Sequence, residues 1–355
     1  MEHPQKLALV LDDQSLTYAE LLHSSQLLAH HLTDRCQIQP DDIVAQCVDR
    51  SIEMIIGILS ILMSGASYCP LSPNQPSARL LSLIEQVKTK CVLSHNRTNT
   101  LIPSSDVDIS RILPSLNPTN FSDNDVLINI NSIAYVVSTS GSTGIPKLIP
   151  ISHKNFAACI NALSQSSIMM QNETVLQITP TTFDIHIQEI LGTLWLGGCI
   201  CLLRPNGNLD MNYLTSVVQR NQITFAITVP TLLATIAQHV HNYHDKHHTL
   251  ISLQRLCSIG EPLRPRTASL LYDYLNPSAV IYHLYGPTEC IFATTFHQIT
   301  KADLQLDSLP IGRPLLGYKC YILDSYLQPV LADHQIGELF IGGEAVFGGY
   351  LHRLD

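Results

Sequence analysis

A cluster of small, hydroxyl-bearing and glycine residues is the clearest candidate for chemistry in this sequence. It lies in the stretch AYVVSTSGSTGIPKLIPISHKN (134–155), where an apolar run gives way to polar residues. Its hydroxyl groups, glycines and positive charge come from Thr139, Ser140, Gly141, Ser142, Thr143, Gly144 and Lys147. Hydroxyls and backbone amides in such a loop can wrap a β,γ-pyrophosphate. An ordinary surface turn remains the alternative, because serine and glycine clusters are common in turns.

The best-known phosphate loop, GxxxxGK[ST], does not fit this stretch. Gly141 and Gly144 are too close together, and Pro146 stands where a helix should open with free amides. We therefore expect a different phosphate grip, in a loop that joins a strand at 134–138 to a helix. That helix is predicted to begin at His153, with Ser152 as its N-cap.

The elements that must position this loop alternate between strand-like and helix-length segments. Buried strands are expected at 42–48, 91–95, 134–138, 174–180, 199–203, 225–230, 253–260 and 280–286. Helices are expected between them, among them an apolar one that ends at Gly65 and one at 187–196. Such alternation favours an α/β fold with parallel sheets flanked by helices on both faces.

The pattern changes in the last part of the chain. From Ile311 onward, glycines, prolines and short runs such as KCYILD and GELFIGG indicate antiparallel hairpins. We expect α/β sheet subdomains over residues 1–300 and a smaller β-rich subdomain over residues 301–355.

Composition excludes several classes of protein. The 355 residues are 45% hydrophobic and 14% charged, which is typical of a well-buried globular protein. The net charge of −9 argues against nucleic-acid binding. Neither a signal peptide nor an apolar stretch long enough to span a bilayer is recognisable, so no membrane association is expected. The ten scattered cysteines include no CxxC pair and indicate free thiols in a reducing compartment, so we expect a cytoplasmic protein.

Several stretches together resemble the motifs of the adenylate-forming (AMP-binding) enzymes. The loop at 138–147 is similar to their TSG[ST]TGxPKG signature. Further similarities, in the family's order, are LTYAEL (16–21), LSILMSGASYCPLSPNQPSARL (59–80), FDIHIQE (183–189), LYGPTE (284–289), IGRPLLGYKCYILD (311–324) and GELFIGGEAVFGGYL (337–351). The form of these motifs most resembles an adenylation domain of nonribosomal peptide synthetases, over almost the whole chain.

The resemblance implies a reaction and a set of ligands. A substrate carboxylate would attack the α-phosphate of ATP, giving an acyl-adenylate and pyrophosphate. Lys147 and Thr288 would act on the phosphates, and Glu289 would hold Mg²⁺, with a solvated loop carboxylate as the alternative. The residues implied around adenine are Gly260, Glu261, Pro262, His283, Tyr285 and Gly286.

The substrate class depends on Asp184. In the family this aspartate pairs with the α-ammonium of an amino acid, and an unpaired buried carboxylate is costly. A helix N-cap is the alternative role for an aspartate at this position. The pocket positions implied by local alignment are Ile185, Gln188, Ile227, Cys257, Ile259, Leu284, Ile291 and Phe292. Because nearly all are apolar, we expect a hydrophobic amino acid, although any protein core contains such residues.

The sequence also departs from the family pattern. Ser138 replaces an aromatic residue, Leu148 and Gly348 replace a glycine and an arginine, and His283 replaces the usual adenine-reading asparagine, although histidine can also form that hydrogen bond. The chain ends at Asp355, before the segment that binds ribose and before the small C-terminal lid domain with its catalytic lysine. We therefore expect a large domain without its lid, slow at best in catalysis, whose partner in a parent protein would be a carrier domain bearing phosphopantetheine.

Three functions stay open on this basis: activation of an amino acid, activation of an acyl or aryl acid for coenzyme A, and a catalytically incompetent nucleotide-binding remnant. A histidine-rich segment, HVHNYHDKHH (239–248), invites a zinc hypothesis. Its spacing does not match a clean helical metal site and no cysteine lies near, so a polar helix end is the preferred interpretation.

Overall fold

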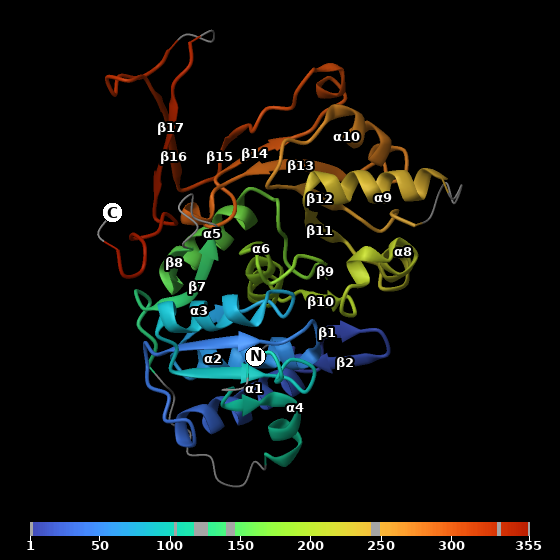
Figure 1. Ribbon diagram of the computed structural model, residues 1–355. Helices are drawn as coiled ribbons and strands as arrows, with labels where there is room; N and C mark the ends of the chain where they lie inside the picture. Colours follow the sequence, from blue (N-terminus) through green and yellow to red (C-terminus); the bar gives the residue numbers. More distant parts are fainter. Residues whose placement is uncertain are drawn as a thin grey trace.

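The computed structural model describes residues 3–102, 105–116, 127–139, 146–242, 249–331 and 335–353. Within these ranges the strands form a six-stranded sheet, a nine-stranded sheet and a two-stranded hairpin. Figure 1 shows the sheets stacked along the molecule, with the hairpin at the end opposite to the first helices. The expected α/β fold, with parallel sheets flanked by helices and a small antiparallel part, is confirmed.

The six-stranded sheet is parallel except at one edge. Its strands, in spatial order, are β6 (Val107–Asp108), β5 (Cys91–Ser94), β3 (Ile43–Cys47), β4 (Ser67–Pro70), β7 (Ile133–Thr139) and β8 (Lys147–Ser152). The helices in this part of the chain are α1 (Tyr18–Asp34), α2 (Ile52–Met63), α3 (Ser77–Val87) and α4 (Ile109–Ile112). The apolar helix α2 ends just before Gly65, whose φ of 80° is accessible to glycine, as predicted.

The nine-stranded sheet has a parallel centre and antiparallel edges. Its strands, in spatial order, are β15 (Arg313–Pro314), β14 (Thr295–Gln298), β13 (Val280–Tyr285), β12 (Arg255–Ser258), β11 (Phe225–Thr228), β9 (Thr174–Gln177), β10 (Cys199–Leu202), β1 (Leu7–Leu11) and β2 (Gln14–Thr17). Further helices are α5 (His153–Gln165), α8 (Met211–Arg220), α9 (Pro230–Asn242) and α10 (Pro265–Tyr272).

The strand before the phosphate loop leads into another strand and not into a helix. Thr139 of β7 pairs with Lys147 of β8 in an antiparallel ladder, and α5 begins only at His153. The prediction of a strand-to-helix loop was therefore wrong, although the predicted cap was right, because Ser152 accepts a hydrogen bond from the amide of Asn155. Prolines at 146 and 150 oppose a helix between the loop and Ser152, and the apolar residues between them pair well in a sheet.

The helical segment that carries Asp184 and Gln188 is irregular. It consists of α6 (Ile185–Ile187), a π-helical turn (Gln188–Gly192) and α7 (Thr193–Trp195). It therefore begins two residues before the predicted helix at 187–196. π-Helical turns often occur at functional sites, and this one begins at Gln188, four residues after Asp184.

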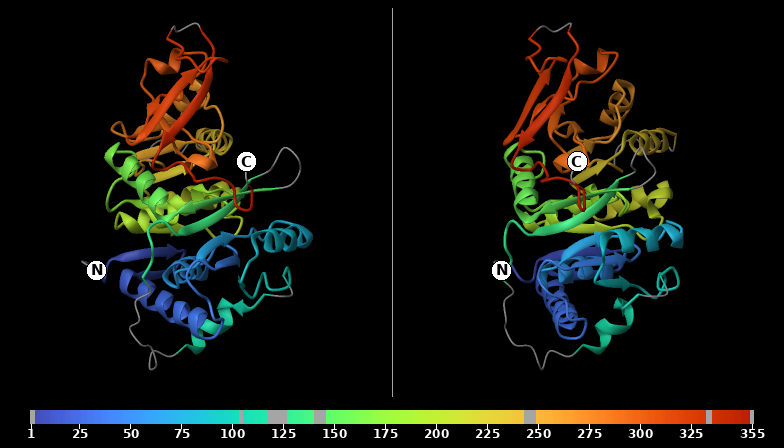
Figure 2. Two further views of the ribbon diagram at one scale, coloured as in Figure 1. Left: turned by 90° about the vertical axis from the view of Figure 1, so that its left-hand side faces the viewer. Right: turned by 60° about the vertical axis from the view of Figure 1, so that its left-hand side comes forward.

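The C-terminal part of the chain contains the expected hairpin. Strand β16 (Tyr318–Leu323) pairs antiparallel with β17 (Glu338–Gly343), and Figure 2 shows this hairpin projecting from the two larger sheets. Strand β15, which precedes it, adds an edge to the nine-stranded sheet. The division into residues 1–300 and 301–355 stays a prediction.

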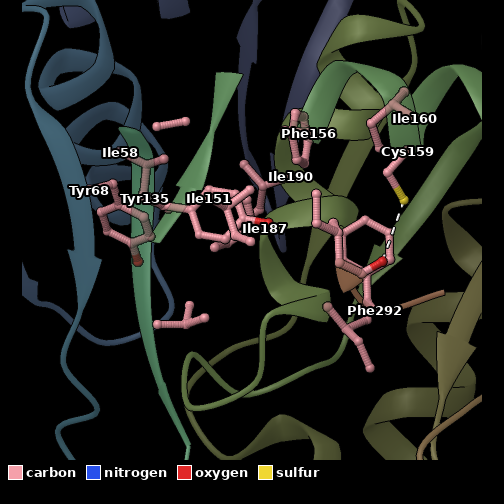
Figure 3. Close-up of a cluster of buried hydrophobic side chains, with 14 of the residues drawn as sticks. Ile58, Tyr68, Tyr135, Ile151, Phe156, Cys159, Ile160, Ile187, Ile190 and Phe292 are labelled. Carbon is pink, nitrogen blue, oxygen red and sulfur yellow. Dashed lines mark hydrogen bonds between the residues drawn. The ribbon is translucent and has the colours of Figure 1, made fainter. Parts of the chain in front are cut away.

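One hydrophobic core joins the two large sheets. Figure 3 shows Tyr68 and Tyr135 of the six-stranded sheet in the same cluster as Ile187, Ile190 and Phe292. All five side chains are fully or almost fully buried. Because this core packs on both sides of the segment after Asp184, it holds that segment against β7 and against the turn after β13.

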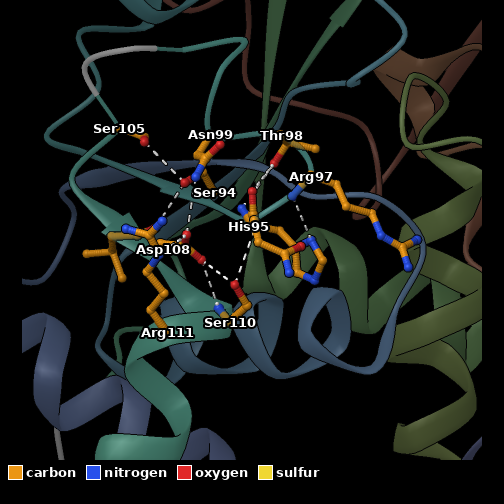
Figure 4. A network of polar contacts seen from close by, with 11 residues as sticks. Ser94, His95, Arg97, Thr98, Asn99, Ser105, Asp108, Ser110 and Arg111 are labelled. Carbon is orange, nitrogen blue, oxygen red and sulfur yellow. Dashed lines mark hydrogen bonds and ion pairs between the residues drawn. The ribbon is translucent and has the colours of Figure 1, made fainter.

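A polar network supports the outer edge of the six-stranded sheet. Asp108 accepts hydrogen bonds from the backbone amide of Ser110 (3.1 Å) and from the side-chain amide of Asn99 (3.4 Å), and pairs with Arg111 (3.3 Å) (Figure 4). The bonds connect the segment after β5 to the first turn of α4. Since none of the predicted site residues takes part, we assign this network to the scaffold.

Candidate active site

Most of the predicted site residues meet at one edge of the nine-stranded sheet. Ile227, Cys257 and Leu284 lie near the carboxyl ends of the parallel strands β11, β12 and β13, and Gly260 follows β12. Ligands of open α/β sheets bind outside the carboxyl ends of the strands. The sheet thus places residues that are far apart in sequence at a single candidate site.

The glycine of the YGPTE segment is required by a close backbone approach. A Cβ atom on Gly286 would lie 2.6 Å from the carbonyl oxygen of Phe292 and 2.7 Å from the Cα atom of Ala293. Any larger residue would push the segment after Glu289 away from β13. Gly286 therefore lets the chain fold back so that Phe292 returns beside the motif.

The turn after Glu289 holds a strained backbone. Ile291 and Phe292 have φ values of 54° and 41°, in the left-handed region that β-branched and bulky residues rarely adopt. The turn is fixed by the amide of Thr294, which donates to Tyr285 (2.7 Å), and by the hydroxyl of Tyr318, which donates to Cys290 (2.8 Å). Strain of this kind persists only where the surroundings enforce it, and it is concentrated at functional sites.

Asp184 lies buried next to this turn, with 8% of its surface exposed. Burial raises its pKa to about 6, while the hydroxyl of Thr288 and the backbone of Phe292 act in the opposite direction. Its side chain forms no capping hydrogen bond, so the alternative role as an N-cap is not supported. Within the described part of the chain, Oδ2 has no hydrogen-bond partner. A buried carboxylate oxygen in this state favours a cationic ligand.

The predicted pocket residues are all buried: Ile185, Gln188, Ile227, Cys257, Ile259, Leu284, Ile291 and Phe292. Gln188 is the polar exception. Its Nε2 atom lies 3.8 Å from the sulfur of Met169, and its Oε1 atom has no partner among the described residues. A thioether can accept but cannot donate, so the amide nitrogen faces it and the oxygen is left as an acceptor. Asp184 and Gln188 are one helical turn apart and share a face of the segment.

The residues predicted to surround adenine are accessible, apart from one. Tyr285 is 39% exposed, and Gly260, Glu261 and Pro262 form an exposed turn in which Gly260 has a φ of 90°. His283 is only 3% exposed, and its Nδ1 atom lies 3.1 Å from the carbonyl oxygen of Pro310. Because a carbonyl only accepts, Nδ1 donates, and a neutral imidazole then keeps Nε2 as an acceptor. Such an acceptor can receive a hydrogen bond from an exocyclic amine.

The phosphate side of the site is described only in part. Thr139 and Lys147 lie at the adjoining ends of β7 and β8. The other predicted members of the loop, Ser140, Gly141, Ser142, Thr143 and Gly144, lie outside the described residues.

Tyr350 contacts two of the predicted site residues, although motif comparison did not single it out. Its hydroxyl lies 2.8 Å from Oε1 of Glu289 and 3.3 Å from Nζ of Lys147. The closing motif around it was recognised in the sequence, but nothing there indicated a contact with residues 61 and 203 positions away.

Glu189 is a second buried carboxylate near the site, but it is fully satisfied. Burial raises its pKa to about 7, and hydrogen bonds from Thr179 and Gln177 lower the pKa in part. We assign it a structural role.

Magnesium is compatible with the residues present. No group of three or more potential metal ligands occurs in the part of the chain that the structure describes. Mg²⁺, however, commonly binds through one or two carboxylates together with the phosphates of a nucleotide. The half-buried carboxylate of Glu289 suits that mode. The histidine-rich segment is described only in part, and there the Nδ1 atom of His241 contacts Tyr274 at 2.9 Å.

Comparison with known proteins is consistent over the whole length of the chain. The model of the family described as AMP-binding enzyme matches residues 1–351. Bacitracin synthase 2 of Bacillus licheniformis is 32% identical over 99% of this chain, which spans 13% of that protein. Zwittermicin A synthase ZmaJ of Bacillus cereus is 31% identical, over 99% of this chain and 67% of its own length.

Solved structures agree with these sequence relatives. The N-terminal subdomain of Klebsiella oxytoca NpsA in complex with 3-hydroxybenzoyl-AMSN is 25% identical, with a TM-score of 0.86 over 98% of this chain and 84% of that one. The nonribosomal peptide synthetase FmoA3, in its α-methyl-L-serine-AMP bound form, has a TM-score of 0.89 at 22% identity, over 99% of this chain and 39% of that one. The similarity to FmoA3 bears on the fold.

Proposed function

Since the chain belongs to the family of AMP-binding enzymes, we propose that it activates the carboxylate of an amino acid as an aminoacyl-adenylate, with release of pyrophosphate. A carboxylate oxygen of the substrate attacks the α-phosphorus of ATP, and the bond from that phosphorus to the bridging oxygen of the β-phosphate breaks. Both reactants are anions, so the site must align them and offset their charge.

The described residues divide this task between two sides of the site. Lys147 and Thr139, at the adjoining ends of β7 and β8, would face the phosphates, and the hydroxyl of Thr288 contacts Asp184. Glu289 would hold Mg²⁺, which when bound offsets the charge of the phosphates. Tyr285 offers a ring surface to adenine, and Nε2 of His283 offers an acceptor to its amino group.

Asp184 carries the proposal that the substrate is an amino acid. Its carboxylate is buried, lacks a partner for Oδ2 among the described residues, and lies next to Thr288. An α-ammonium group would supply the missing charge and donors. The remaining pocket residues are apolar apart from Gln188, which supports a largely hydrophobic side chain.

Activation of an aryl or acyl acid is the second candidate. NpsA, whose N-terminal subdomain is 25% identical to this chain, has been solved with 3-hydroxybenzoyl-AMSN and anthranilyl-AMSN. A substrate of this kind without an α-ammonium would leave Asp184 without its cation.

The test is a thermal-shift panel with non-hydrolysable aminoacyl-adenylate analogues, leucyl, valyl and phenylalanyl among them, and with matched analogues that lack the amino group. At a hundred times its dissociation constant, a ligand should stabilise the fold by about 2.7 kcal/mol. The proposal is supported if aminoacyl analogues shift the melting temperature of the unaltered protein but not that of Asp184→Ala, while analogues without the amino group shift both proteins alike. If the aminoacyl analogues shift both proteins equally, the result supports activation of an aryl or acyl acid. If no analogue shifts the unaltered protein, the result contradicts both candidate functions.

The setting of this activity is a further part of the proposal. We propose that the activated amino acid passes to the phosphopantetheine arm of a carrier domain, a pairing supported by the solved structure of NpsA artificially fused to a PCP domain. All ten cysteines are free thiols, which supports a reducing, cytoplasmic environment. Over the described ranges, no helix combines the length and apolarity needed to cross a bilayer.

A further inference from the structure

The hydroxyl group of Tyr350 connects the two charged residues of the phosphate side. Lys147 stands at the start of β8 and Glu289 in the turn after β13, and both contact the same oxygen atom, at 3.3 Å and 2.8 Å. The ammonium of Lys147 also lies 4.7 Å from the centre of the Tyr350 ring, within range of a cation–π interaction. Tyr350 thus contacts the lysine with both its ring and its hydroxyl.

The chemistry of the three groups fixes the direction of these hydrogen bonds. A lysine ammonium can only donate and a carboxylate can only accept, so the tyrosine hydroxyl accepts from Lys147 and donates to Glu289. Only one of the two carboxylate oxygens, Oε1, accepts the hydrogen bond from Tyr350.

The backbone around Tyr350 is tied to both neighbours. The amide of Phe347 donates to the carbonyl of Glu289 (2.9 Å), and the amide of Leu351 donates to the carbonyl of Leu148 (2.9 Å). The rings of Phe347 and Tyr350 pack edge to face, with centres 5.0 Å apart. Figure 2 shows the C-terminal segment returning to the β7–β8 pair. The position of the hydroxyl is therefore set by the fold.

We propose that Tyr350 is a positioning residue of the nucleotide site, which orients Glu289 for a divalent cation and Lys147 for the phosphates. The inference rests on the proposed function, because it assigns a role within the same site. Without the hydroxyl, both long side chains would have to lose rotamer freedom when ligand arrives.

The experiment compares Tyr350→Phe with the unaltered protein. Phenylalanine keeps the ring over Lys147 and the packing against Phe347 and removes one oxygen atom. Thermal shift is recorded while Mg²⁺ is titrated at saturating ATP, with EDTA as the zero point. We expect the apparent dissociation constant for Mg²⁺ to rise roughly tenfold, as for loss of one hydrogen bond to a charged group. Tyr326→Phe is the matched control, since Tyr326 is 82% exposed, and it should change nothing.

A double-mutant cycle separates positioning from a general loss of stability. Glu289→Gln should also raise the constant for Mg²⁺, and Tyr350→Phe should add no further change in that background. The inference is overturned if Tyr350→Phe leaves the constant unchanged while Glu289→Gln raises it, or if the two effects multiply. If the unaltered protein shows no Mg²⁺-dependent response to ATP, the proposed function fails and this inference fails with it.

Discussion

Replacement of Asp184 by asparagine probes the central feature of the proposed site. The substitution keeps the size of the side chain but removes its ability to ionise. In the free protein, the carboxylate is buried and its Oδ2 atom lacks a partner among the described residues, so ionisation opposes folding. In the complex, the same charge would bind the substrate ammonium. Asp184→Asn should therefore stabilise the free protein at neutral pH and weaken the complex.

The size and sign of the effect follow from the pKa. The folded-state pKa of Asp184 is raised from 3.8 to about 6, which corresponds to about 3 kcal/mol at neutral pH. Because the folded value is the higher one, the carboxyl's contribution to stability is fully present below about pH 3.8 and is lost as pH rises through 6. Between pH 4 and pH 6, the unaltered protein should lose about 2 kcal/mol relative to Asp184→Asn, and above pH 7 the two curves should run parallel.

The assay is the free energy of unfolding in urea, measured from pH 4 to pH 8 for both proteins. Glu189, whose pKa is raised to about 7, also destabilises the fold as pH rises, but it does so in both proteins. The difference between the two curves therefore isolates Asp184. A second arm repeats the measurement with an aminoacyl-adenylate analogue and with its des-amino counterpart.

Two results would refute the reasoning. If the two proteins have parallel pH curves throughout, Asp184 is not held in an environment that opposes its charge. If Asp184→Asn responds to the aminoacyl analogue as strongly as the unaltered protein does, the carboxylate does not bind the ammonium.

Three further predictions address other parts of the site. Gly286→Ala should destabilise the protein by about 1–3 kcal/mol in a urea titration, because the added Cβ would meet the Phe292 carbonyl. Gly348→Ala is the control and should have little effect, since a Cβ there faces open space. Equal effects of the two substitutions would contradict the close approach. Gln188→Leu should stabilise the free protein by about 1–3 kcal/mol, since it removes a buried oxygen without a described partner. In the thermal-shift panel, this variant should prefer adenylate analogues with purely apolar side chains. An unchanged preference would place Gln188 outside the pocket. Lys147→Met should weaken ATP binding roughly tenfold by isothermal calorimetry, as expected for loss of one charge-assisted contact, and adenosine, which lacks phosphates, should bind equally to both proteins.

The sequence by itself determined features that depend on neighbouring residues. Helix α2 and its end before Gly65, the N-cap at Ser152 and the β16–β17 hairpin follow from apolar periodicity and turn residues within a few positions. The YGPTE segment and the FD pair were recognised because the chemistry of such motifs requires particular residue types in order.

Only the tertiary structure decided how distant segments meet. It pairs β7 with β8, where local signals indicated a loop leading to a helix. It leaves Asp184 without a cap bond, and it brings Tyr350 to Lys147 across 203 positions. Such contacts depend on sheet pairing and on the shared core, whose free energy comes from burial between segments far apart in sequence. A motif therefore predicts which groups a site contains, while the packing of the two large sheets decides which of them touch.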